Sequence, residues 1–141
     1  MKIDFETKYF QKMSFTEKAI LRYLNNALKD LKIAEVNKSP EVIFKFSYDS
    51  LIKIGIALIA FCGYKVKGRQ GHHIRILEKL SCILRNKEIE IIGERMRKKR
   101  NLDLYDGGTI TSKKETEYYL NFIKKTIFQA EKCIKKQESL F

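Results

Sequence analysis

The sequence contains no tryptophan and only one proline in 141 residues, and few of its segments alternate in the manner of a β-strand. Segments with a helical apolar period dominate instead. We therefore predict an all-α fold, an up-and-down bundle of about five helices forming one domain over 1–141, with 1–13 loosely ordered. The longest apolar run, 54–62, is far shorter than the roughly 20 residues that cross a bilayer, so no membrane association is expected.

Cysteine is also scarce. Cys62, Cys82 and Cys133 lie far apart and form no CxxC pair, so the sequence predicts no structural zinc site, and no metal or cofactor is expected. Each lies in an apolar helical segment, which predicts a small buried side chain. Thiols of this kind fit a reducing compartment, and the start of the chain, with Asp4 and Glu6, is unlike a signal peptide. We expect a cytoplasmic protein.

Acidic residues are too few to balance the basic ones. The formal net charge is +12 and the isoelectric point is about 9.6, as in domains that bind nucleic acid or another polyanion. A composition bias toward lysine and isoleucine is the alternative explanation. Residues 71–100 hold nine basic and four acidic residues, whereas 101–141 hold seven and six, and this clustering favours a functional role.

Short motifs mark the expected helix starts. A serine cap followed by an acidic residue or a proline occurs three times, as Ser14 with Glu17, Ser39 with Pro40, and Ser112 with Glu115. The expected helices are 15–36, 40–62, 72–84, 87–102 and one that follows Ser112. The second is apolar on nearly every side over 51–62, which predicts a central helix that a partner subunit partly buries. Gly55 in that helix permits a close helix approach.

A basic loop follows, bounded by Gly63 and Gly71. Lys65, Lys67 and Arg69 are candidates for binding phosphates of a nucleic acid, although the loop lacks the Lys-Ser/Thr pair of a phosphate-binding loop. A plain solvated connection is the alternative.

Two adjacent histidines, His72 and His73, then open the third helix. Neighbouring helical residues point about 100° apart, so the pair is not expected to chelate a metal. The simplest expectation is that one histidine packs or bonds a loop carbonyl while the other is exposed.

The fourth helix breaks its own pattern. Ile89, Ile92 and Met96 form an apolar stripe, and four residues further on the stripe receives Arg100. A guanidinium at a core-facing position is costly unless it is paired or faces a cleft or a partner. Asn101 and Tyr105 follow it, and we predict that this stretch is the functional site.

Residues 15–136 resemble a HEPN domain (higher eukaryotes and prokaryotes nucleotide-binding). Two pieces carry the resemblance, the buried second helix that runs through the glycine-rich loop to the paired histidines (46–73) and the stretch Arg100-Asn101-Leu102-Asp103-Leu104-Tyr105. Ribonuclease members of the family have an Arg, often followed by Asn, and then a His after four to six positions. Tyr105 stands where that His is expected. Small prokaryotic branches, many encoded beside nucleotidyltransferases, show a similar ending.

The resemblance implies a HEPN-like bundle that forms a homodimer and brings two Arg motifs together in an interfacial cleft. In active members this cleft cuts RNA without a metal, using the ribose 2′-hydroxyl as nucleophile. An arginine can pair with a phosphate and stabilise developing charge, and Asn101 can orient Arg100 or donate to a phosphate oxygen. The cations expected to hold the flanking RNA are Arg95, Arg97, Lys98 and Lys99.

The departure at Tyr105 leaves three possibilities. Its hydroxyl donates to the leaving oxygen or serves as a hydrogen-bond partner; His72 or His73 supplies the missing group from another helix; or the site binds RNA without cutting it. A tyrosine that only packs the helix end is the structural alternative.

Three functions follow. The chain is a metal-independent endoribonuclease of a toxin–antitoxin or defence system, or a non-catalytic dimer that binds RNA, a nucleotide or a partner nucleotidyltransferase. The third is a structural dimer in which Arg100 pairs with Asp103 or Asp106 of the other chain.

Overall fold

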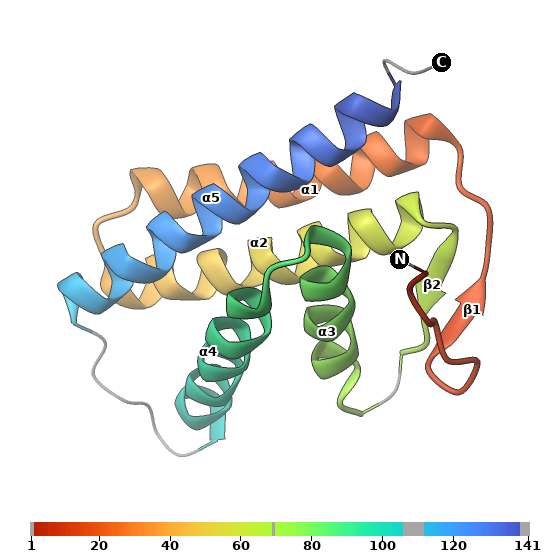
Figure 1. The fold of residues 1–141 in the computed structure, drawn as a ribbon. Coiled ribbons are helices and arrows are strands. Elements are labelled where there is room, and N and C mark those ends of the chain that lie inside the picture. Colours follow the sequence, from red (N-terminus) through yellow and green to blue (C-terminus); the bar gives the residue numbers. More distant parts are fainter. Residues whose placement is uncertain (1, 69, 106–111, 139–141) are drawn as a thin grey trace.

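The computed structural model describes residues 2–68, 70–105 and 112–138 of the chain. Within these residues it has five helices and one small two-stranded sheet, so the prediction of a mainly helical fold is confirmed (Figure 1). The helices are α1 (Glu17–Val36), α2 (Pro40–Phe61), α3 (His72–Leu84), α4 (Lys87–Tyr105) and α5 (Lys113–Glu138), and the strands are β1 (Phe10–Lys12) and β2 (Tyr64–Val66).

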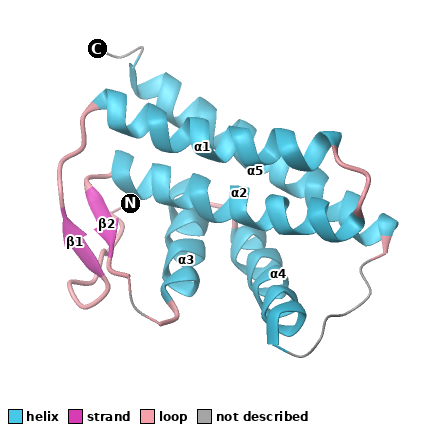
Figure 2. Ribbon diagram, turned by 180° about the vertical axis from the view of Figure 1, so that it is seen from behind, coloured by secondary structure: helices cyan, strands magenta, loops and turns pink. Residues whose placement is uncertain are grey.

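Helix α2 lies at the centre of the fold and contacts every other helix. Helices α1 and α5 pack along it, whereas α3 and α4 extend away from its other side, unlike a simple up-and-down bundle (Figure 1, Figure 2). Leu51, Ile54 and Leu58 have no exposed surface in the single chain. Neighbouring helices of the same chain cover these residues, so their burial needs no partner subunit, and the predicted dimer stays a prediction.

Two glycines let α3 lie close between α2 and α4. A Cβ on Gly55 of α2 would overlap Cγ2 of Ile76, and a Cβ on Gly93 of α4 would come within 2.7 Å of Leu77 Cδ2. Ile76 and Leu77 are buried residues of α3. The close approach predicted at Gly55 is confirmed, and it sets the point at which α3 packs against the central helix.

The helix starts agree with the capping motifs except at α1. Thr16, not Ser14, caps α1, and its Oγ1 accepts a hydrogen bond from the Ala19 amide at 3.1 Å. The Ser14 prediction is wrong because the Met13 amide donates to the Gly63 carbonyl at 2.9 Å, which keeps the chain extended up to this point.

The other two starts follow the predicted pattern more closely. Ser112 accepts from the Glu115 amide at 3.0 Å, as expected of a cap. Ser39 occupies the cap position of α2, with Pro40 as the first helical residue, but its side chain makes no capping bond. Proline at the first helical position favours the helix start through its fixed φ, even without this capping bond.

The sheet was not predicted. Strands β1 and β2 are antiparallel, with Phe10 opposite Val66 and Lys12 opposite Tyr64. The Phe5 ring stacks on Tyr64 with centroids 4.2 Å apart. The expectation of a loosely ordered start is therefore wrong for residues 2–13, because pairing with a distant segment and aromatic packing hold them in place.

The cysteines also differ from expectation. Cys62 and Cys82 are exposed and Cys133 is half-buried. Cys62 caps the C-terminal end of α2, where the chain turns away from the core. None of the helices in the described residues has the length and apolar character needed to cross a membrane.

Candidate functional site

The apolar stripe of α4 ends at Arg100. Ile89 and Met96 have no exposed surface, as predicted, and half-buried Arg100 takes the next position along the stripe. Its guanidinium carbon lies 5.6 Å from the centre of the Tyr48 ring in α2. A cation over an aromatic face is attracted by the ring quadrupole, and desolvation strengthens this attraction. The contact with Tyr48 thus explains how the fold accommodates a guanidinium at this position.

Tyr48 links three helices. It has no exposed surface, and its hydroxyl lies 2.9 Å from Nδ1 of His73 in α3. Burial raises the pKa of Tyr48 well above its ordinary value, although the charge of Arg100 acts in the opposite direction. The side chain is therefore a neutral phenol, bound to α3 through its hydroxyl and to α4 through its ring.

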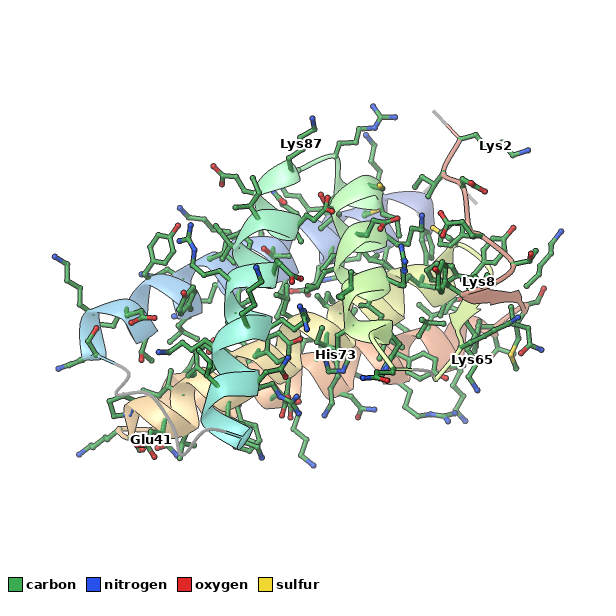
Figure 3. All side chains as sticks on the ribbon, turned by 90° about the horizontal axis from the view of Figure 1, so that it is seen from below. Lys2, Lys8, Glu41, Lys65, His73 and Lys87 are labelled. Carbon is green, nitrogen blue, oxygen red and sulfur yellow. The ribbon has the colours of Figure 1, made fainter. Side chains whose placement is uncertain are left out.

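His73 is held uncharged in this setting. Burial, together with the neighbouring His72 ring and the charge of Arg100, lowers the pKa of His73 to about 4. A neutral imidazole carries one N–H and one lone pair, so it can accept a proton at neutral pH. Figure 3 shows His73 in the space between α3 and α4.

The two histidines differ in their surroundings. The ring centroids of His72 and His73 are 4.6 Å apart in an edge-to-face arrangement, and both residues are half-buried. The simple expectation was partly wrong, because His73 bonds a tyrosine hydroxyl rather than a loop carbonyl and His72 is not exposed. The structure does bring His73 close to Arg100 through their shared contact with Tyr48.

Further charged groups surround this cluster. Asp49 follows Tyr48 on α2 and is half-buried; burial raises its pKa, while Arg100 and Lys45 act to lower it. Arg97 donates from Nε to Glu94 Oε2 at 3.0 Å. Arg97 is therefore tied to a carboxylate of its own helix.

The cations of α4 predicted to hold RNA divide into two groups. Arg95 and Lys98 are exposed, as a backbone-binding role requires. Lys99 is half-buried, lies 3.5 Å from Glu115 of α5, and like Arg97 belongs to an ion pair within the chain. Intramolecular pairing of Arg97 and Lys99 makes them weaker candidates for phosphate contacts than the sequence indicated.

The remaining candidates are spread over the loop and the end of α4. Lys65 is exposed on β2, whereas Lys67 donates to the Thr7 carbonyl at 2.6 Å. Asn101 is half-buried, next to Arg100. Arg69 and the side chain of Tyr105 lie outside the described residues, so their predicted roles stay predictions.

Sequence reasoning missed Tyr48 and Asp49 as site residues. An aromatic residue inside an apolar helix is typical of core packing and gave no separate signal. The available signal was the polar run from Ser47 to Ser50 within an otherwise apolar segment. Ser50 has a structural role, since its hydroxyl donates to the Ala27 carbonyl of α1 at 2.8 Å. Tyr48, two residues earlier, contacts α3 and α4 instead.

Comparisons with known proteins return no matching family model, no significant match among curated proteins and no significant match among solved structures. The resemblance described above therefore stays a prediction. Among the described residues, no group of three or more His, Cys, Asp or Glu side chains is placed to hold a metal ion.

The cluster combines two chemical capacities. Arg100 offers a planar guanidinium that can pair with a phosphate. His73 offers a neutral imidazole beside it, oriented by the hydroxyl of Tyr48. A cation next to a proton acceptor suits a reaction in which a phosphate gains charge while a hydroxyl loses its proton.

Proposed function

We propose that this chain is a HEPN-like protein that acts on RNA as a metal-independent endoribonuclease. The observation that carries the proposal is the contact of Arg100 and His73 with the same buried residue, Tyr48. His73 lies on α3, so a different helix would supply the imidazole that the motif at residues 100–105 lacks. A homodimer with the site at its interface, a toxin–antitoxin or defence role, and a nucleotidyltransferase antitoxin belong to the same proposal through the resemblance.

In the proposed reaction the 2′-oxygen of a ribose attacks the adjacent phosphorus. His73, with its Nδ1–H donated to the Tyr48 hydroxyl, accepts the proton of that 2′-hydroxyl at Nε2, and Arg100 stabilises the charge that builds on the phosphate oxygens. The bond from phosphorus to the 5′-oxygen breaks, which yields a 2′,3′-cyclic phosphate and a 5′-hydroxyl. The leaving oxygen takes its proton from His72 or Tyr105, the alternatives that the sequence leaves open.

A bound RNA phosphate should also affect the pKa of His73. With a pKa of about 4 the imidazole is unprotonated but a weak base. Arg100 contributes to that low pKa, and an RNA phosphate beside Arg100 would offset its charge. The phosphate charge should therefore raise the pKa of His73, although burial, the main cause of its low value, remains.

The decisive experiment is cleavage of single-stranded and transfer RNA in EDTA. Arg100→Ala is expected to lower the rate by about 10²–10³-fold, and His73→Ala by about 10²–10⁴-fold. Arg22→Ala, an exposed arginine of α1, is the matched control and should leave the rate unchanged. RNA methylated at the 2′-oxygen should resist cutting by every variant.

A second measurement separates catalysis from binding. The His73 ring is titrated by NMR with and without 2′-O-methyl RNA, and its pKa should rise when the RNA is bound. Circular dichroism of each variant shows whether the fold is retained. Equal cutting by the native protein and by folded Arg100→Ala would refute the nuclease proposal.

The low basicity of His73 favours a non-catalytic alternative, a cleft that binds RNA or a nucleotide without cutting it. That function requires Arg100 but no general base. Binding of uncut RNA that is lost in Arg100→Ala and kept in His73→Gln would select this alternative.

A further inference from the structure

A second candidate site lies on the opposite side of α3 from His73. A groove of about 360 Å³ is formed by three segments far apart in the sequence: the turn before β1, the residues at the end of β2, and the first turns of α3. Its lining includes Lys8, Tyr9, Lys67, Gly71, His72 and Arg75. Figure 3 shows Lys8 and His73 on opposite sides of α3.

The groove is cationic. Lys8, Lys67 and Arg75 line it, and no Asp or Glu is among the described residues that form its walls. Two carboxylates outside the lining balance part of the Arg75 charge: Glu78 lies 3.4 Å from Nη1 of Arg75, and the charge of Arg75 contributes to the lowered pKa of Glu6. The uncompensated cations of the groove are therefore Lys8 and Lys67. A concave surface lined by cations raises the local concentration of a polyanion such as a nucleic acid.

The groove also offers a flat stacking surface. The guanidinium carbon of Arg75 lies 3.8 Å from the centre of the Tyr9 ring and covers one face of it, so a base in the groove would stack on the guanidinium plane rather than on that face of the ring. Single-stranded RNA is recognised by stacking of unpaired bases on aromatic rings and on guanidinium planes. A volume near the lower end of ligand pockets, about 300 Å³, suits one nucleotide rather than a duplex.

Backbone contacts hold this surface in shape. The Lys67 amide donates to the Tyr9 carbonyl at 2.8 Å, and the Lys67 ammonium donates to the Thr7 carbonyl at 2.6 Å. The backbone amide and the side-chain ammonium of Lys67 thus both hold the turn before β1 against the end of β2. A preformed site loses less entropy on binding than one that must be ordered by its ligand.

His72 connects the groove to the cluster around Arg100. It lines the groove, and its ring lies 4.6 Å from that of His73, which bonds Tyr48. Consecutive helical residues point about 100° apart, so the histidine pair spans part of the way around α3 from the groove to the cluster. One strand of RNA can therefore pass from one surface to the other across the start of α3.

We infer that this groove binds a nucleotide of single-stranded RNA that flanks the one held at Arg100, with the base on the Tyr9–Arg75 pair and the phosphate at Lys8 and Lys67. The inference rests on the proposed action on RNA, but it makes a separate claim. Binding should depend on RNA length, and the groove should contribute only when the strand is long enough to reach it.

The test measures binding of 2′-O-methyl oligonucleotides, which cannot be cut, as a length series from dinucleotide to octanucleotide. The native protein is compared with Lys8→Gln and Arg75→Gln, and Lys12→Gln on β1 is the matched control outside the groove. Each groove variant should bind the octanucleotide about three- to tenfold more weakly, and Lys8→Gln should lower the slope of log affinity against log salt by about 0.7. Binding of the dinucleotide should not change.

A crosslinking experiment locates the base directly. A 4-thiouridine near one end of the octanucleotide should crosslink to Tyr9 or His72 on irradiation, and Tyr9→Ala should abolish the Tyr9 adduct while thermal unfolding shows that the fold persists. If the groove variants lose affinity equally for the dinucleotide and the octanucleotide, or have no effect, the inference about the groove is overturned and the proposed function is not. Failure of the native protein to bind any oligonucleotide would overturn the proposed function with it.

Discussion

The hydroxyl of Tyr48 lies 2.9 Å from Nδ1 of His73, so a residue with no exposed surface in α2 orients the imidazole at the start of α3. The same phenol lies beneath the guanidinium of Arg100 from α4. One side chain therefore sets the relative positions of three helices at the point where we propose that RNA is held. This arrangement makes the site sensitive to changes that leave its own charged groups untouched.

Removing the Tyr48 hydroxyl should destabilise the fold. Tyr48→Phe keeps the ring under Arg100 but leaves Nδ1 of half-buried His73 without this partner, which should cost about 1–3 kcal/mol. Tyr118→Phe removes a hydroxyl from an exposed tyrosine of α5 and should change the free energy of unfolding by less than about 0.5 kcal/mol. Urea denaturation of the two variants checks this, and equal stabilities would show that the Tyr48–His73 bond contributes nothing.

The low pKa of His73 predicts a specific dependence of stability on pH. In the unfolded chain its pKa returns to about 6.5, whereas in the folded protein it is about 4. Above pH 6.5 both states are neutral and the group has no effect. Between these values only the unfolded state binds the proton, so stability falls as the pH falls, by roughly 1–3 kcal/mol in total.

His73→Gln isolates this contribution because glutamine can still form a hydrogen bond with the Tyr48 hydroxyl but does not titrate. Denaturation at pH 7 and at pH 4.5 should show a larger loss of stability for the native protein than for the variant. Carboxylates such as Glu6 and Glu94, whose pKa values are lowered by hydrogen bonds from Lys79 and Arg97, also weaken the fold in acid. They are present in both proteins, so they cancel in the comparison. Parallel pH profiles would contradict the assignment.

Local sequence signals predicted most of the helices. Helix α3 spans the expected residues, and α2 and α5 begin at the expected proline and serine. These signals act within one turn, so they can be recognised without knowing what packs nearby. The cap at Thr16 was missed because a bond from Met13 to Gly63, fifty residues along the chain, keeps Ser14 out of the helix.

Only part of the candidate site could be predicted, because local sequence signals do not show which distant residues contact each other. Arg100 interrupts an apolar stripe, and such a break is visible in the sequence. The link from Tyr48 to His73 joins residues 25 positions apart on different helices, and an aromatic residue in an apolar helix looks like ordinary core. The strands β1 and β2 are three residues each, too short for an alternating pattern to be recognised.

The buried lysine of α3 should be a major anchor of the N-terminal segment. Lys79 is 3% exposed, and its ammonium lies 2.8 Å from Glu6 and 3.1 Å from Glu78. Glu6→Gln removes one of these charges and should destabilise the protein by about 1–3 kcal/mol. Glu117→Gln, an exposed position on α5, is the control and should be nearly neutral.

A double-mutant cycle measures how far Glu6 and Lys79 depend on each other. Lys79→Met removes the buried charge, and the double variant Glu6→Gln/Lys79→Met should be more stable than the sum of the single effects predicts, by at least about 0.5 kcal/mol. Additive effects in the cycle would show that the segment is held by the rings of Phe5 and Tyr64 rather than by the ion pair.

The close packing of α3 against its neighbours predicts an order of stability among three glycine variants. Gly55→Ala brings a methyl group against Cγ2 of Ile76, a β-branched side chain with little freedom, and should cost about 1–3 kcal/mol despite the better helix propensity of alanine. Gly93→Ala meets the end of the more flexible Leu77 side chain and should cost less. Gly68→Ala has no heavy atom within 4 Å of its new methyl group and should be neutral or slightly stabilising. Urea denaturation should give this order, and a stabilising Gly55→Ala would mean that α3 does not pack on α2 as closely as described, which would also place His73 farther from Tyr48.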